Sequence, residues 1–157
     1  MEFSRYFETA TIPNRIHHFL ANMARKHNVV VTTNFDCLIE TAVMLQGVQP
    51  KVVITKSDFE AGGDPARNAA TNSVAIYKIH GSPRNITTGE DTRGSVVSTL
   101  DALGKHKGGD VFALETFKRS FFDKACNGRT LVVLGYSGGG MTSTWFPRCS
   151  ACRDYHA

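Results

Sequence analysis

Short apolar runs alternate along the chain with longer segments in which apolar residues recur at helical spacing. The β-branched run at 29–31 leads into polar residues, and the next apolar positions, from 38 to 45, follow a helical period. Similar apolar runs predict further strands at 51–55, 74–79 and 130–134. Strands that alternate with helices are typical of an α/β fold, so we predict a Rossmann-like, doubly wound parallel sheet with flanking helices.

Two longer amphipathic helices are also predicted. The first spans about 14–26 and turns an apolar stripe toward the sheet, formed by Ile16, Phe19, Leu20 and Met23. The second ends near Cys126, before Asn127 and Gly128, and its stripe contains Leu114, Phe117, Phe121 and Ala125. Both stripes place these helices against a core.

The remaining segments carry weaker patterns. Residues 56–73 contain Gly62–Gly63–Asp64–Pro65 and are predicted to form a long loop, and 84–95 should be flexible. Residues 95–100 fit a short strand and a helical period equally well. We expect one domain over 1–137, followed by an irregular tail over 138–157.

Polar or small residues follow three of the predicted strands. In open α/β sheets, ligands bind at the carboxyl ends of the strands. The candidate binding residues are therefore Thr33, Asn34 and Asp36, His80 and Gly81, and Gly135 and Ser137. Each group also has a structural interpretation: Asp36 is a natural helix N-cap, His80 could be bonded within a turn, and Gly138–Gly140 could begin a flexible tail.

Composition narrows the class of protein. The 157 residues are 41% hydrophobic and 20% charged, as in an ordinary globular domain. The formal charge of +4 comes without a dense Lys/Arg run, so no specific nucleic-acid partner is expected. We expect no membrane span, because no apolar run approaches the roughly 18 residues that one needs. The N-terminus lacks the apolar region of a secretory signal, which favours a cytoplasmic location.

The four cysteines do not predict a metal site. Cys149 and Cys152 form a Cys-x-x-Cys pair, but Cys37 and Cys126 lie far from each other and from that pair. A structural zinc site needs a second pair of ligands at finger-like spacing. His17 and His18 have no accompanying ligand cluster either. We therefore expect no metal.

Three segments at the strand ends carry a resemblance to a known family. They are Thr-Thr-Asn-Phe-Asp at 32–36, Lys-Ile-His-Gly-Ser at 78–82 and Gly-Tyr-Ser at 135–137. In this order the chain resembles the sirtuin-like family, and most closely the bacterial sirtuin-like domains that cleave NAD. The four-cysteine zinc module of the deacylase sirtuins has no counterpart, which argues against protein deacylation.

The resemblance implies NAD as the substrate and a role for each matching residue. Asn34 would position the nicotinamide ribose and the attacking water, and His80 would act as general base on the ribose hydroxyls. Asp36 would lie near the nicotinamide. The other implied cofactor-binding residues are Thr33, Gly81, Gly135 and Ser137. The relatives that the chain resembles often deplete NAD in bacterial defence against phage.

One departure from the family's pattern bears on activity. The family opens with a strand and a Gly-Ala-Gly-[Ile/Val]-Ser loop that cradles the pyrophosphate, and no such segment precedes residue 14. We therefore expect a domain truncated at its N-terminus, and at its C-terminus too, that binds NAD weakly and turns it over slowly or not at all. The alternative is a noncatalytic binding or assembly module, completed by a homo-oligomer or by a chain that supplies the missing strand.

Overall fold

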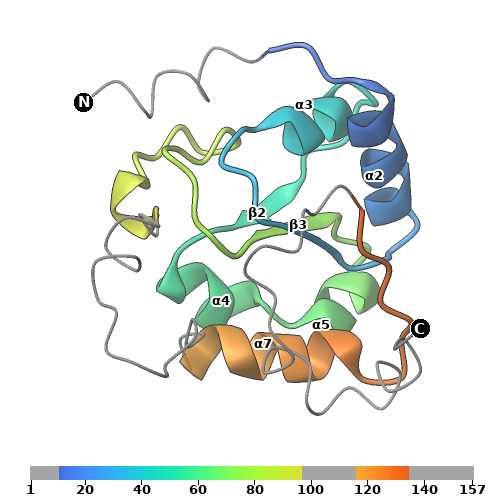
Figure 1. The fold of residues 1–157 in the computed structure, drawn as a ribbon, viewed down its shortest axis with the longest axis vertical. Helices are drawn as coiled ribbons and strands as arrows, with labels where there is room; N and C mark the ends of the chain where they lie inside the picture. The colour runs from blue at the N-terminus through green and yellow to red at the C-terminus, as the bar shows by residue number, and fades with distance from the viewer. Residues whose placement is uncertain (1–10, 97–115, 135–157) are drawn as a thin grey trace, which may run out of the picture. The chain divides into compact units, whose positions relative to one another are not determined.

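The computed structural model describes residues 11–96 and 116–134. The chain divides into two compact units, Met1–Ser98 and Thr99–Ala157, which are described separately. Three parallel strands form the sheet of the first unit: β1 (Val30–Thr32), β2 (Lys51–Val53) and β3 (Ala75–Lys78), in the order β1-β3-β2 (Figure 1). This arrangement confirms the predicted α/β, Rossmann-like fold.

The central strand, β3, and its register with β1 determine where the candidate site residues lie. All four of its residues are buried, as expected for a parallel strand covered on both faces. It pairs with β1 so that Thr32 lies opposite Lys78. Asn34 and His80 each follow this matched pair by two residues. The register therefore brings the two predicted catalytic residues to neighbouring strand ends.

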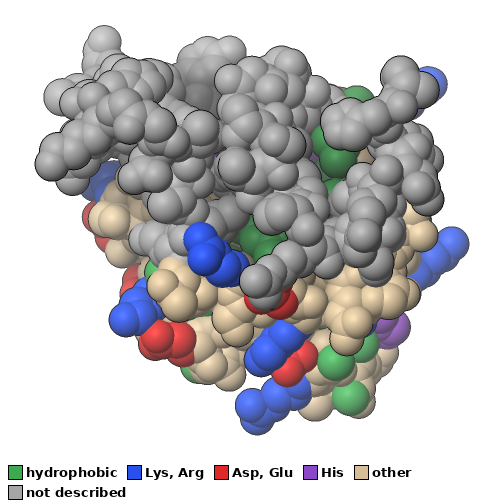
Figure 2. All heavy atoms as spheres, turned by 60° about the horizontal axis from the view of Figure 1, so that its bottom comes forward, with side chains coloured by type: hydrophobic (Ala, Val, Ile, Leu, Met, Phe, Trp, Pro, Cys, Tyr) green, Lys and Arg blue, Asp and Glu red, His purple; other side chains and the backbone are tan. Residues whose placement is uncertain are grey.

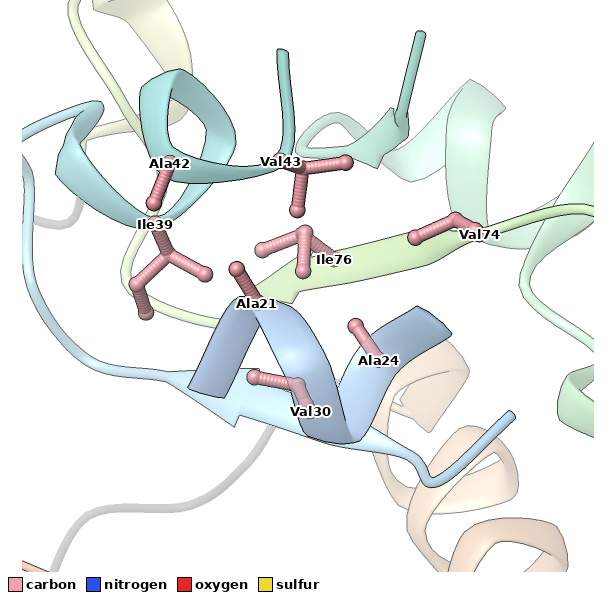
Figure 3. Packing of buried hydrophobic residues seen from close by; sticks show 8 residues of the cluster. All are labelled: Ala21, Ala24, Val30, Ile39, Ala42, Val43, Val74 and Ile76. Carbon is pink, nitrogen blue, oxygen red and sulfur yellow. The ribbon is translucent and has the colours of Figure 1, made fainter. Parts of the chain in front are cut away.

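One face of the sheet is covered by α2 (Arg15–Arg25) and α3 (Leu38–Met44). Side chains from both helices, β1 and the β3 region point toward one another in a single apolar cluster (Figure 3). Its buried members are Ala21, Ala24, Val30, Ile39, Ala42, Val43, Val74 and Ile76. The helix over 14–26 and the helical period after residue 38 are thereby confirmed.

The inward face of α2 differs from the predicted stripe. Ala21 and Ala24 are its buried residues, whereas Ile16 and Phe19 are 57% and 51% exposed. Alanines carry no bulk beyond Cβ, so they allow close packing of a helix against its neighbours. The larger side chains at one end of the predicted stripe are consequently left facing water.

The other face of the sheet is covered by α4 (Lys56–Gly62) and α5 (Pro65–Ala70), so the prediction of a long loop over 56–73 was wrong. Both helices begin at strong caps. Thr55 and Asp58 form a capping box at the start of α4. Asp64, which precedes Pro65, is the N-cap of α5, and its side chain accepts from the backbone amides of Ala66 and Arg67. These caps outweigh the glycines that suggested a loop.

Residues 82–95 form a loop whose two ends are bonded to each other, and the flexibility expected for 84–95 stays a prediction. An antiparallel bridge joins Arg84 to Asp91. The Thr92 amide donates to the Pro83 carbonyl at 3.0 Å, and its hydroxyl donates to the Ser82 carbonyl at 2.7 Å. The loop ends in a 3-10 turn, η1 (Arg93–Ser95), while residues 97–100 lie outside the described residues.

In the second unit, the structure describes α7 (Thr116–Cys126) and the segment after it. The predicted end of this helix near Cys126 is confirmed, and Gly128 has a φ of +66°, which suits glycine after a helix. Residues 130–134 form no strand in the structure, so the strand predicted there is wrong. Their apolar side chains are 37% to 71% exposed. An apolar run forms a strand only where a neighbour completes its hydrogen bonds.

Basic and acidic side chains are interspersed on the described surface seen in Figure 2. Such mixing agrees with the modest formal charge of +4. Among the residues that the structure describes, no helix combines the length and apolar character needed to cross a membrane.

Candidate functional site

The candidate site consists of the residues that follow β1 and β3, 33–37 and 79–82, which we call the crest. The Asn34 amide donates to the Thr32 hydroxyl at 3.0 Å, so the chain turns as soon as β1 ends. Asn34 is exposed and Thr33 is half-buried. The turn therefore presents Asn34 to solvent, where its side-chain amide is accessible to a ligand.

Asp36 lies one position before Cys37, the N-cap of α3, and bonds to the start of that helix. Its Oδ1 accepts from the Leu38 amide, the first residue of α3, at 3.0 Å. This bond satisfies one of the amides that a helix start leaves without an intrahelical partner. The N-cap position belongs to Cys37 and not to Asp36, so the N-cap prediction for Asp36 was wrong by one residue. A contact of Asp36 with the nicotinamide stays a prediction.

His80 lies beside the loop that carries Asn34. The ring centroids of Phe35 and His80 are 6.3 Å apart with a tilt of 35°, within the usual range for an aromatic pair. His80 is half-buried, whereas the rest of its strand end is buried. The imidazole is thus supported on one side by Phe35, the direct neighbour of Asn34.

Gly81 is required by its conformation and by its surroundings. Its φ is +83°, a region that side-chain-bearing residues rarely adopt, and a Cβ there would collide with the Ser95 carbonyl. The Gly81 amide donates to the Lys78 carbonyl at 3.2 Å. These contacts give Gly81 a packing role in the turn, and its contact with NAD stays a prediction.

A buried ion pair lies beneath the crest. Lys78, the last residue of β3, is 0% exposed and Glu40 of α3 is 1% exposed, with Nζ and Oε1 separated by 3.1 Å. The ammonium also donates to the Asp36 carbonyl. Among the described residues, neither Glu40 oxygen accepts a hydrogen bond of good geometry, so the pair is held by charge. Burying two charges costs free energy that their attraction only partly offsets.

Ser82 and Cys37 complete the contact between the two strand ends. The Ser82 hydroxyl donates to the Phe35 carbonyl at 3.2 Å and lies 3.9 Å from the Cys37 sulfur. Burial raises the pKa of the Cys37 thiol, and the Glu40 carboxylate raises it further, against the lowering effects of Lys78, Ser82 and Arg84. The raised pKa favours the neutral thiol, which is not the form that acts as a nucleophile.

The sequence patterns missed the roles of Lys78, Glu40 and Ser82. A signal was present at Lys78, because a lysine at the end of an apolar strand seldom becomes buried without a counterion. Its partner could not be identified, since Glu40 lies 38 positions earlier in a helix whose buried side was read only from apolar residues. Pairing between distant segments is set by the fold.

Two of the predicted site residues, Gly135 and Ser137, lie outside the described residues. Within the described part of the chain, no group of three or more His, Cys, Asp or Glu residues could hold a metal ion. Cys37 is a free thiol.

The comparison with protein families decides the family of this chain. The model of the SIR2-like domain matches residues 28–140, which include the whole crest. The chain belongs to the SIR2-like domain family. Neither a curated protein nor a solved structure shows a significant match to it.

Membership in the SIR2-like family indicates a ligand for the domain as a whole. SIR2-like domains bind NAD. The matched region begins at Asn28, just before β1, and therefore contains all three described strands. The two segments that resemble family motifs, 32–36 and 78–82, overlap the crest, and the hydrogen bonds of Lys78 and Ser82 join them.

Proposed function

We propose that this SIR2-like domain is an NAD glycohydrolase that releases nicotinamide and ADP-ribose. The observation that carries the proposal is the crest, where the loop with Asn34 and the turn with His80 end two paired parallel strands. Family membership supports NAD as the ligand. In open α/β sheets, this is the edge at which ligands bind.

The chemistry requires few groups. As the bond between ribose C1′ and the nicotinamide nitrogen breaks, its electron pair leaves with nicotinamide and positive charge develops on the ribose. Water adds to C1′ and loses a proton. The Asn34 side chain would orient the ribose and the water, and His80 would accept a proton from a ribose hydroxyl. Imidazole suits this task because its ordinary pKa is about 6.5.

The polar side chains near the two strand ends differ in exposure and in the contacts described for them. Lys78 and one oxygen of Asp36 are engaged by the protein itself, through the bonds that they make with the crest and α3. Asn34 is exposed and His80 is half-buried. Two polar side chains near one loop fit the ribose end of NAD, whereas contacts with the pyrophosphate are assigned to Gly135 and Ser137 as predictions.

The test measures nicotinamide released from NAD by the purified chain and four variants. Asn34→Ala and His80→Ala should each lower kcat by roughly 10²-fold or more, since positioning and general-base catalysis each contribute at least that much. Asn22→Ala and His18→Ala make the same changes on α2, outside the crest, and should keep the parental rate. A parental rate in both crest variants would contradict the proposal.

A second candidate is an assembly module without turnover. Within the described sheet, β1 and β2 each pair with a neighbour on one side only. Such edges are templates for pairing with another chain. A folded parent that associates with itself in sedimentation experiments and releases no nicotinamide would favour this function over the glycohydrolase. In either case, a part in phage defence is a proposal that rests on the family resemblance alone.

A further inference from the structure

Two side chains from the end of β3 and the turn after it donate hydrogen bonds to two consecutive carbonyls of the loop after β1. Ser82 Oγ donates to the Phe35 carbonyl at 3.2 Å, and Lys78 Nζ donates to the Asp36 carbonyl. Phe35 and Asp36 directly follow Asn34. The backbone that carries Asn34 is therefore fastened to the segment that carries His80 at two adjacent points.

The charge on Lys78 is difficult to explain by stability alone. Lys78 and Glu40 are both fully buried, and an apolar pair of similar volume is often as stable as a buried ion pair. An apolar pair could not donate a hydrogen bond to the Asp36 carbonyl. Apart from the ion pair with Glu40, that bond is what the ammonium provides to its surroundings and what a methionine of similar length could not provide.

Glu40 acts on Lys78 and not on the loop directly. Its Oε1 lies 3.1 Å from Nζ, and no described residue donates a well-formed hydrogen bond to either of its oxygens. A carboxylate in this position places a negative charge beside the ammonium within the protein interior. It lies on α3, the helix that the crest loop enters, so the ion pair also joins β3 to that helix.

We propose that Lys78 and Ser82 are positioning residues that hold the Asn34 loop in place relative to His80, with Glu40 as the counterion that keeps Lys78 in position. The catalytic consequence rests on the proposed glycohydrolase function. We call the hydrogen bonds from Lys78 and Ser82 to this loop the tethers. Their effect on the loop does not depend on that function, because it can be measured without NAD.

The decisive variant removes the charges without leaving one of them unpaired. Lys78→Met combined with Glu40→Leu replaces the pair with apolar side chains, so the fold should keep a denaturation midpoint near that of the parent. Ser82→Ala removes the second tether. Ser57→Ala makes the same change at an exposed hydroxyl on α4 and serves as the matched control.

Two readouts follow in each variant: amide hydrogen exchange in residues 33–38, by mass spectrometry, and kcat and KM for nicotinamide release. Loss of a tether should speed exchange in this segment by about tenfold, the change expected for one hydrogen bond. The double variant and Ser82→Ala should also lose roughly tenfold to 10²-fold in kcat, with a smaller change in KM, because a displaced Asn34 impairs alignment more than binding. Ser57→Ala should match the parent in both readouts.

Two results would overturn the inference. Parental exchange over 33–38 in both tether variants would show that neither side chain holds the loop. Parental kcat in a stable double variant would show that the ion pair only supports the fold. A parent that releases no nicotinamide would instead overturn the proposed function, and exchange alone would then decide whether the tether exists.

Discussion

Tyr77 and Lys78 are neighbours on the central strand, and they face opposite layers of the first unit. On the α5 side, Asn68 Nδ2 donates to the Tyr77 hydroxyl at 2.8 Å and to the Gly62 carbonyl at 2.9 Å. On the α3 side, Lys78 meets Glu40, whose oxygens accept no well-formed hydrogen bond from a described residue. Tyr77 is joined to its layer by a neutral hydrogen bond, and Lys78 to the opposite layer by buried charge.

The two kinds of contact suggest different roles, one in supporting the fold and the other in function. A neutral amide and a phenol join α5 to the sheet at little desolvation cost, which suffices for a structural contact. A buried ion pair costs more and stabilises less, so its presence calls for a second purpose. The charged face is the one that leads into the crest, where the lysine reaches the Asp36 carbonyl.

The largest effect should come from breaking the charged face on one side only. Lys78→Met leaves the Glu40 carboxylate buried without its counterion and should lower the free energy of unfolding by about 3–5 kcal/mol. Urea denaturation measures the loss. Lys56→Met is the matched control, because Lys56 pairs with Glu60 at an exposed site, with a 3.7 Å separation, and should change stability by less than about 1 kcal/mol. Equal losses in the two variants would contradict the comparison.

A smaller effect is expected on the neutral face. Asn68→Ala removes the donor to Tyr77 and Gly62, and also the acceptor for Lys51 Nζ at 3.3 Å. The free energy of unfolding should fall by about 1–3 kcal/mol, while nicotinamide release per folded molecule stays at the parental rate. Denaturation and kinetics on the same sample check both parts. A fall in kcat at full folding would mean that the two faces are not independent.

The smallest effect concerns pH. The pKa of the Cys37 thiol is raised in the fold, chiefly by burial and then by Glu40. Its contribution to stability is therefore complete below the pKa of an unfolded thiol, about 8.5, and is lost as pH rises through the higher folded value. The stability of the parent relative to Cys37→Ala should decrease between pH 7 and pH 10 in denaturation experiments. A constant difference across this range would show that the thiol is not shifted.

The sequence predicted the elements whose signals are local. The β-branched runs became β1 and β3, and the polar residues after them form the crest. The same rule failed at 130–134, because an apolar run becomes a strand only when another strand accepts its hydrogen bonds. Thr55–Asp58 and Asp64–Pro65 were local signals for α4 and α5, but neighbouring glycines obscured them.

The candidate site was predictable only in part. Asn34 and His80 were placed correctly at neighbouring strand ends, and their part in catalysis stays a prediction. The contacts that join their segments could not be predicted, since Lys78 lies far in sequence from Glu40 and Asp36, and His80 lies far from Phe35. Local pattern identifies which residues a ligand could meet, and tertiary packing determines what holds them.

The closed loop after His80 has a consequence for how this domain can change over time. Its stem is fixed near Ser82 by Thr92, and the Arg84–Asp91 bridge closes the chain before its exposed tip at Thr88 and Gly89. Residues inserted at the tip would lengthen the loop, and residues exchanged there would change its surface, without altering the bonds of the stem. The loop is thus a position where evolution, or an engineered insertion, can introduce new surface while the turn that carries His80 keeps its geometry.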